Sequence, residues 1–212
     1  MFTGIIRYQG EIVQLKRVSG GTRLVIEAPS DVVERLEEGI TSIALDGSCH
    51  TVEKKEGTCF EVYSSFETLE RTTLGEAKVG RKLNLELPVT PSGLLDGHVV
   101  MGHVDGIGRL LSKKQKGEAA LYRFEVPRDL EVYLVEKDSI AIDGISLTLF
   151  DIDGGQFSVA VIPQTLAHTT LGVKREGEKV NIEVHLLAKY HYEFMRRREN
   201  KERLLEEWMR SL

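Results

Sequence analysis

The chain has 212 residues, and 33 acidic residues against 28 basic ones give a net charge of −5 at pH 7. Nucleic acid and anionic membranes attract a basic surface, so this balance argues against both as partners. The length allows one or two domains, no apolar run approaches the ~18 residues of a membrane span, and the first residues do not resemble a secretory signal.

Short segments rich in β-branched and aromatic residues follow one another through the first half. Most alternate apolar with polar residues, which is typical of half-buried strands, and turn-forming residues separate them. The predicted strands are residues 10–15, 23–27, 42–45, 59–64 and 82–87. Short helices are predicted at residues 30–36 and 67–69.

A linker is predicted at Leu87-Pro-Val-Thr-Pro-Ser-Gly93, which carries two prolines and a glycine. It separates a first domain, residues 1–92, from a second domain, residues 93–186. Corresponding strands in the second domain are residues 108–111, 122–126, 139–142, 157–162 and 179–184, with helices at 128–135 and 164–166. The two halves therefore share one order of elements.

The halves also share sequence. Ser42-Ile-Ala-Leu-Asp-Gly-Ser-Cys-His-Thr-Val52 returns as Ser139-Ile-Ala-Ile-Asp-Gly-Ile-Ser-Leu-Thr-Leu149, an offset of 139 − 42 = 97 residues. Solenoid repeats have periods of about 20 to 50 residues, so this period indicates a duplicated domain. Several short strands in under ~100 residues suit a small closed antiparallel barrel, and we predict one barrel per half.

A helix is predicted for residues 187–212, which contain no proline or glycine and are rich in Glu, Arg, Leu and Lys. Seven apolar residues form a broken stripe along it: Leu187, Tyr190, Phe194, Leu204, Leu205, Trp208 and Leu212. Such a stripe packs either back onto its own chain or against copies of itself. We favour the second, an oligomerisation helix.

The repeated Asp-Gly-x-[Ser/Cys]-x-Thr segment is the richest in chemistry. Alternation along a strand places Cys49 and Thr51 on one face, with His50 on the other. Ser146 and Thr148 share the equivalent face of the second copy, with Leu147 opposite. The alternative is structural: Asp-Gly forms a hairpin turn, and threonine is simply a good strand residue.

Two histidines, His98 and His103, lie in the glycine-rich segment 97–106 and can titrate near neutral pH. They cannot share one strand face, and supporting metal ligands are missing at the usual spacings, so no metal site is predicted. Phosphate-binding and Rossmann glycine motifs are also missing. Cys49 and Cys59 have Ser146 and Gln156 as counterparts, so no shared disulfide is expected, and we predict a soluble cytoplasmic protein.

From Met1 to about Tyr190 the chain resembles the α-chain type of riboflavin synthase. The resemblance is carried by Met1-Phe-Thr-Gly-Ile-Ile6, the two repeated segments, residues 97–106, Ile162-Pro-Gln-Thr165 and Thr169-Thr-Leu-Gly172. It implies an all-β fold of two tandem six-stranded Greek-key barrels with a C-terminal helix. It also implies a homotrimer, with each active site between the first barrel of one subunit and the second barrel of a neighbour.

The resemblance implies the last step of riboflavin biosynthesis, in which two molecules of 6,7-dimethyl-8-ribityllumazine exchange a four-carbon unit. The products are riboflavin and 5-amino-6-ribitylaminouracil. No cofactor is implied, since one substrate donates what the other accepts. Lumazine synthase, which makes the substrate, is a further partner whose association with this chain can be tested.

Carried over by position, the family's catalytic residues are Ser146, Asp143, His103 and Cys49. Ser146, Asp143 and His103 are expected on the second-barrel side, and Cys49 on the first. The expected substrate contacts are Phe2, Thr3, Ser42, Thr51, Thr68, Thr148, Ile162 and Thr165. Phe2 and Thr3 belong to an N-terminal segment expected near the pocket.

Three positions depart from the family. His50 replaces a usual leucine, Gln164 a histidine and His185 an aspartate. By strand alternation His50 faces away from the ligand and is expected in the core or on the surface.

A non-catalytic lumazine- or flavin-binding antenna protein is the main alternative function. An electron-transfer flavoprotein is disfavoured, because Glu61-Val-Tyr-Ser64 lacks the arginine of a flavin-binding motif.

Overall fold

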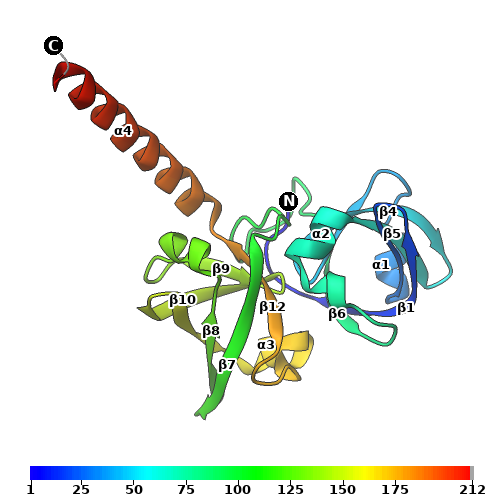
Figure 1. The fold of residues 1–212 in the computed structure, drawn as a ribbon. Coiled ribbons are helices and arrows are strands. Elements are labelled where there is room, and N and C mark those ends of the chain that lie inside the picture. The colour runs from blue at the N-terminus through cyan, green and yellow to red at the C-terminus, as the bar shows by residue number, and fades with distance from the viewer. Residues whose placement is uncertain (211–212) are drawn as a thin grey trace.

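The computed structural model describes residues 1–210, with side chains for residues 1–203, and shows two barrels and a projecting helix (Figure 1). The first barrel closes in the strand order β1-β2-β5-β4-β3-β6, entirely by antiparallel pairs. Its strands are β1 (Tyr8–Val18), β2 (Gly21–Glu27), β3 (Ser42–Leu45), β4 (Ser48–Glu56), β5 (Cys59–Ser65) and β6 (Lys82–Glu86).

The second barrel repeats this architecture and closes in the order β10-β11-β8-β7-β12-β9. Its strands are β7 (Gly106–Lys116), β8 (Ala119–Glu125), β9 (Ser139–Ile142), β10 (Ile145–Asp153), β11 (Gln156–Val161) and β12 (Lys179–Val184). Both predicted barrels are confirmed. The limits at residues 92/93 and 186/187 stay predictions.

Each barrel carries short helices at matching places. They are α1 (Ser30–Glu34), α2 (Phe66–Arg71), η1 (Thr73–Glu76), η2 (Arg128–Tyr133), α3 (Pro163–His168) and η3 (Thr170–Gly172). The predicted helix at 128–135 is a 3-10 helix in the structure. Apolar side chains on alternate strand positions fill each barrel, so each half has its own core.

The Asp-Gly pairs form the two-residue turns of the β3–β4 and β9–β10 hairpins. Both turn residues have positive φ, 45° and 81° at Asp46-Gly47 and 46° and 79° at Asp143-Gly144. Asp-Gly suits such turns, since aspartate tolerates this conformation and glycine adopts it freely. A Cβ on Gly47 would lie 2.7 Å from the nitrogen of Gly144, so the two turns meet back to back.

The C-terminal helix α4 (Leu186–Arg210) projects away from both barrels (Figure 1). Its start is tied to the second barrel by a Lys189–Asp105 ion pair at 2.7 Å and by Tyr192 packing on Tyr133. Beyond these contacts, the described residues of α4 do not pack back along their own chain. Leu187, Tyr190 and Phe194 are 67%, 69% and 70% exposed. The side chains of Leu204, Leu205 and Trp208, and all of Leu212, lie outside the described residues.

Candidate active site

Two chain segments lie between the barrels and shape the site. Phe2 and Val100 form an antiparallel bridge, in which the Phe2 N–H donates to the Val100 carbonyl at 2.7 Å and the reverse bond is 3.1 Å. Phe2 is 0% exposed and packs with Ala44, Val100 and Ala141. The expected substrate contact Phe2 is therefore a packing residue between the barrels in this structure.

On the second barrel the N-terminal segment closes one side of a cavity. The carbonyl of Gly4 accepts the Ser146 N–H at 2.8 Å, and a Cβ on Gly4 would lie 2.6 Å from the Cβ of Ser146. Only glycine allows this approach. The cavity of about 590 Å³ is lined by Gly4, Ile5, Ile6, Arg7, Ile145, Ser146, Ile162, Gln164, Thr165, His168 and Thr169. Three predicted residues, Ser146, Ile162 and Thr165, thus meet here.

The imidazole beside Ser146 belongs to His98, whose Nδ1 lies 2.7 Å from Ser146 Oγ. Burial lowers the pKa of His98 to about 4; the charge of His185 also lowers it, while that of Asp138 raises it. His98 is therefore neutral at pH 7, and its Nδ1 can accept the Ser146 hydroxyl proton.

The first barrel carries an equivalent arrangement around Cys49 on β4. The Cys49 N–H donates to the carbonyl of Gly102 at 2.8 Å, and a Cβ on Gly102 would lie 2.6 Å from that of Cys49. Thr68, which corresponds to Thr165, has its Oγ1 3.1 Å from Ser65 Oγ at the start of α2. Cys49 and Gly102 thus repeat the relation between Ser146 and Gly4.

Among the described residues, the predicted grouping of His103 with Ser146 is not seen within one chain. His103 directly follows Gly102, so it lies on the first-barrel side, where Cys49 is. We call the surroundings of Cys49 the first half-site and those of Ser146 the second half-site. The segment from His98 to His103 runs from the second half-site to the first, so the two histidines lie at different half-sites. The sequence singles out both histidines, and the family resemblance implies the second-barrel side for His103. Nothing local shows where the segment crosses between the barrels.

Two glutamates hold the two segments that cross between the barrels, which are the N-terminal residues 2–4 and residues 98–103. Glu86 accepts hydrogen bonds from the Thr3 N–H (2.7 Å), the Thr3 hydroxyl (2.8 Å) and the Gly4 N–H (3.0 Å). Glu183 accepts the N–H groups of Met101, Gly102 and His103 at 2.6, 3.0 and 3.0 Å. Burial raises the pKa of both carboxyls, that of Glu183 to about 7. Thr3 is thus buried against Glu86.

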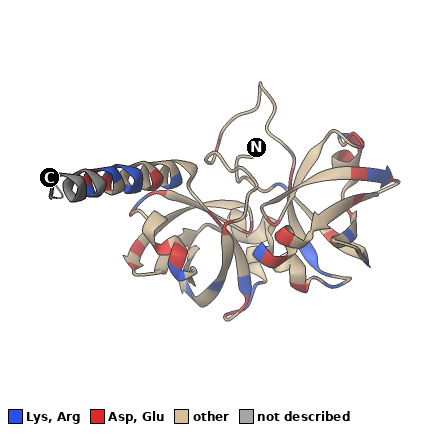
Figure 2. Ribbon diagram, turned by 45° about the horizontal axis from the view of Figure 1, so that its top comes forward, with Lys and Arg blue, Asp and Glu red and all other residues tan. Residues whose placement is uncertain are grey.

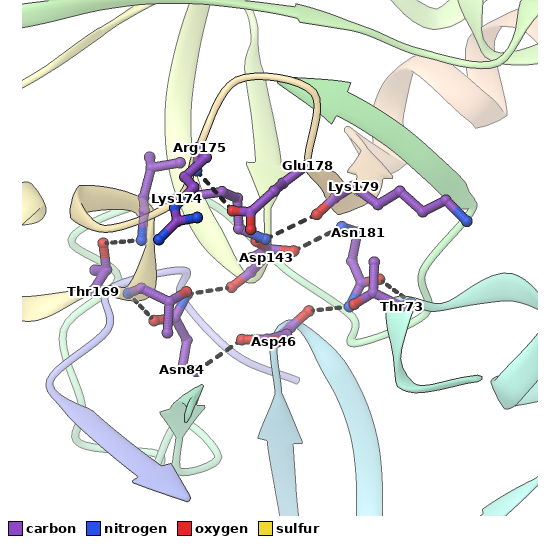
Figure 3. Close-up of polar contacts among 12 residues, drawn as sticks. Asp46, Thr73, Asn84, Asp143, Thr169, Lys174, Arg175, Glu178, Lys179 and Asn181 are labelled. Carbon is purple, nitrogen blue, oxygen red and sulfur yellow. Dashed lines mark hydrogen bonds and ion pairs between the residues drawn. The ribbon is translucent and has the colours of Figure 1, made fainter. Parts of the chain in front are cut away.

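Asp143 lies in the junction between the barrels (Figure 3), and it is not among the residues that line the cavity beside Ser146. Its carboxylate accepts the Asn181 N–H at 2.7 Å and pairs with Lys174 at 2.6 Å. It is 0% exposed. Asp143 belongs to the second barrel, as expected, but the contacts described for its carboxylate are with Asn181 and Lys174 and not with Ser146.

The junction has near two-fold symmetry (Figure 3). Asp46 accepts the Asn84 N–H and pairs with Arg81, each at 2.8 Å. The side-chain amide of Asn84 donates to the Asp143 carbonyl at 3.0 Å, and that of Asn181 donates to the Asp46 carbonyl at 2.8 Å. These bonds fix one barrel against the other, so Asp143 serves the placement of both half-sites.

The remaining predicted contacts lie on the outer barrel faces. Ser42 pairs with Thr51 across β3 and β4, as Ser139 does with Thr148 across β9 and β10. Thr51 and Thr148 are exposed, whereas His50 and Leu147 are buried, which confirms the predicted alternation. Thr148 is not among the residues that line the cavity beside Ser146.

His50 is a core residue. Its Nδ1 lies 2.8 Å from the Ser48 carbonyl and its Nε2 lies 2.8 Å from Ser64 Oγ. A carbonyl only accepts, so Nδ1 carries the proton and Nε2 accepts from the serine. Burial lowers the pKa of His50 to about 4. The expectation that His50 lies on the strand face opposite Cys49 and Thr51, in the core or on the surface, is met by a core position.

This geometry makes the stability of the protein depend on pH through His50. Its pKa is about 4 in the folded chain, against 6.5 as the reference value. As pH falls from 7.5 to 5, only the unfolded chain takes up this proton, so the wild type should lose about 2 kcal/mol of unfolding free energy through His50. Urea unfolding of wild type and His50→Leu at both pH values measures this loss as a change in their difference. A difference that stays constant with pH would contradict the assignment.

In the described part of the chain, no helix is long and apolar enough to cross a membrane, and no three His, Cys, Asp or Glu side chains are grouped to hold a metal ion. Figure 2 shows the N-terminal segment and the connection between the barrels almost free of basic and acidic residues, whereas both are interspersed along α4.

Comparison with known proteins gives one family. The model of the lumazine binding domain matches twice, over residues 3–88 and 101–185. Riboflavin synthase of Chlamydia pneumoniae is 40% identical, over 93% of this chain and 96% of that protein. Riboflavin synthase of Bacillus subtilis (strain 168) is 37% identical, over 95% and 93%. That of Actinobacillus pleuropneumoniae is 38% identical, over 92% and 90%.

Solved structures show the same fold. The crystal structure of LumP complexed with riboflavin matches with a TM-score of 0.81 and 25% identity, over 87% of this chain and 100% of that chain. LumP complexed with 6,7-dimethyl-8-(1'-D-ribityl) lumazine matches with a TM-score of 0.79 and 24% identity, over 87% and 99%.

Proposed function

Because this chain belongs to the riboflavin synthase family, we propose that it converts two molecules of 6,7-dimethyl-8-ribityllumazine into riboflavin and 5-amino-6-ribitylaminouracil. The duplicated half-site is the observation that carries this proposal. Cys49 and Ser146 hold equivalent positions, each closed by a glycine of a crossing segment. Two copies of one site suit two copies of one substrate. The products together contain all atoms of both substrates, so the proposed reaction takes no cofactor.

The second half-site supplies a nucleophile and its base. Neutral His98 accepts the hydroxyl proton of Ser146 across 2.7 Å, so the serine oxygen, or a water that it orients, can add to C7 of a bound lumazine. Ile162 and Thr165 line the same cavity and would contact the ring system and ribityl chain. Holding the two substrates in a fixed orientation supplies the rest of the rate enhancement.

The first half-site holds the other lumazine, whose C7 methyl group must lose a proton. Cys49 and His103 are the groups that we assign near this proton, with Thr68, Ser42 and Thr51 as surrounding contacts. The four-carbon transfer makes the protein a transferase. We place it in the cytoplasm, since both Cys49 and Cys59 are free thiols.

We also propose that three chains assemble through α4, with each active site formed by the first barrel of one subunit and the second barrel of its neighbour. The exposed Leu187, Tyr190 and Phe194 support this, because a projecting helix gains most by burying such side chains.

Association with lumazine synthase would deliver the substrate to this assembly, and co-sedimentation of the two proteins tests it.

The test of the function is incubation of the purified protein with 6,7-dimethyl-8-ribityllumazine, followed by absorbance and fluorescence. We expect one riboflavin for every two lumazines consumed. Tight binding without turnover would instead identify a lumazine-binding antenna protein, a function for which the likeness to LumP is the supporting observation.

A further inference from the structure

His185 lies between β12 and α4, and its ring packs edge to face on His98. The ring centroids are 5.5 Å apart and the planes meet at 81°. His185 Nδ1 lies 2.7 Å from Asp138 Oδ1, and the same oxygen accepts the Ser139 N–H at 2.8 Å. Asp138 and His185 are therefore fixed at the start of β9, directly behind the imidazole that contacts Ser146.

We propose that His185 and Asp138 are positioning residues for His98, which hold its ring in the orientation that lets Nδ1 accept the Ser146 hydroxyl. This inference rests on the proposed function, since it adds two residues to the same site. The four residues follow one another in contact. Asp138 precedes β9 and contacts His185, which follows β12. His185 contacts His98 in the connection between the barrels, and His98 contacts Ser146 on β10.

His98 needs such support because its backbone lies outside the strands of either barrel. Its N–H donates to the Thr3 carbonyl at 3.1 Å, and the one hydrogen bond described for its ring is the contact with Ser146. An imidazole with a single hydrogen bond can still rotate, and an edge-to-face aromatic contact restricts that rotation. The 2.7 Å contact with Asp138 in turn fixes the ring of His185.

The pair also controls the charge of His98. Of the groups that face it, Ser146 on β10 and the Thr3 carbonyl carry no charge, which leaves His185 and Asp138. After burial, the main cause, His185 lowers the pKa of His98 and Asp138 raises it. Removing one partner should therefore shift this pKa in one direction, and removing the other should shift it in the opposite direction.

The experiment compares His185→Gln with Asp138→Asn. In His185→Gln, Asp138 acts on His98 without the opposing charge of His185, so the loss of kcat for riboflavin formation at acidic pH should begin at a higher pH than in the wild type. At pH 7.5 we expect kcat of His185→Gln to be about tenfold lower with little change in KM, since orientation is lost and binding is not. Asp138→Asn should not show this shift to higher pH.

Asp153→Asn, on the exposed end of β10, is the control for removing a carboxylate from this barrel. Imidazole nitrogen NMR provides a readout that does not depend on turnover: the titration midpoint of His98 should rise in His185→Gln and not rise in Asp138→Asn. Equal midpoints in wild type and His185→Gln would overturn the inference. A wild type that forms no riboflavin would defeat the proposed function, while the NMR titration would still test the coupling of the two histidines.

Discussion

Replacing Ser146 with alanine is expected to lower kcat for riboflavin formation by about 10²- to 10³-fold. The variant loses the oxygen that lies 2.7 Å from His98 Nδ1, and with it the group that adds to C7 or orients the attacking water. Binding of 6,7-dimethyl-8-ribityllumazine should change by less than about tenfold, because one neutral hydrogen bond contributes about 0.5 to 1.5 kcal/mol. Single-turnover kinetics and fluorescence titration separate these two effects.

The control is Ser112→Ala on β7, which removes a hydroxyl from the same barrel outside the site. It should keep the wild-type kcat. Cys49→Ala, at the equivalent position of the first barrel, shows whether the two half-sites contribute equally. If Ser146→Ala turns over at the wild-type rate, Ser146 has no part in the chemistry, and His98 must act directly on water or substrate.

Deleting residues 190–212 should dissociate the proposed trimer and reduce activity about tenfold or more. Most of α4 projects from the second barrel (Figure 1), and among the described residues Tyr190 and Phe194 stay 69% and 70% exposed. Each residue of that size contributes about 1.5 to 3 kcal/mol when buried, so three copies of the helix together supply much of the association energy. Light scattering gives the mass, and the riboflavin assay gives the activity.

A double variant and a single variant separate the effect of losing the assembly from the effect of removing residues 190–212. Tyr190→Ser with Phe194→Ser should weaken the trimer in the full-length chain, whereas Arg197→Gln removes only a surface pair with Glu193 and should leave the mass unchanged. A truncated monomer with full activity would contradict the site shared between subunits. A trimeric truncation would place the assembly surface on the barrels instead.

Much of the fold could be predicted from local patterns. Alternation of apolar and polar residues located the strands, and Asp46-Gly47 and Asp143-Gly144 located two hairpin turns, because a strand face and a turn type depend on a few neighbouring residues. The same alternation placed His50 on the strand face opposite Cys49 and Thr51. The 97-residue repeat then predicted two like barrels, since equivalent sequences fold alike.

The site could be predicted only in part. Position matching put Ser146, Ile162 and Thr165 at one place, and they line one cavity. It did not show that His103 follows Gly102 on the Cys49 side or that Asp143 is buried in the junction, and it missed His98 as the partner of Ser146. Each error concerns a residue whose surroundings come from the other barrel or from a crossing segment.

By itself the sequence determined that this protein has two barrels of one family, a charged C-terminal helix, and matching reactive positions at Cys49 and Ser146. Only the tertiary structure decided which histidine meets Ser146, why Asp143 is buried, and how His185 and Asp138 reach His98. The physical reason is the distance along the chain between the residues that interact. Strand faces and turns arise from contacts a few residues apart. His98, Ser146 and His185 are instead brought together by the junction of the barrels, where Gly47 meets Gly144 and the side chains of Asn84 and Asn181 each bond to the other barrel.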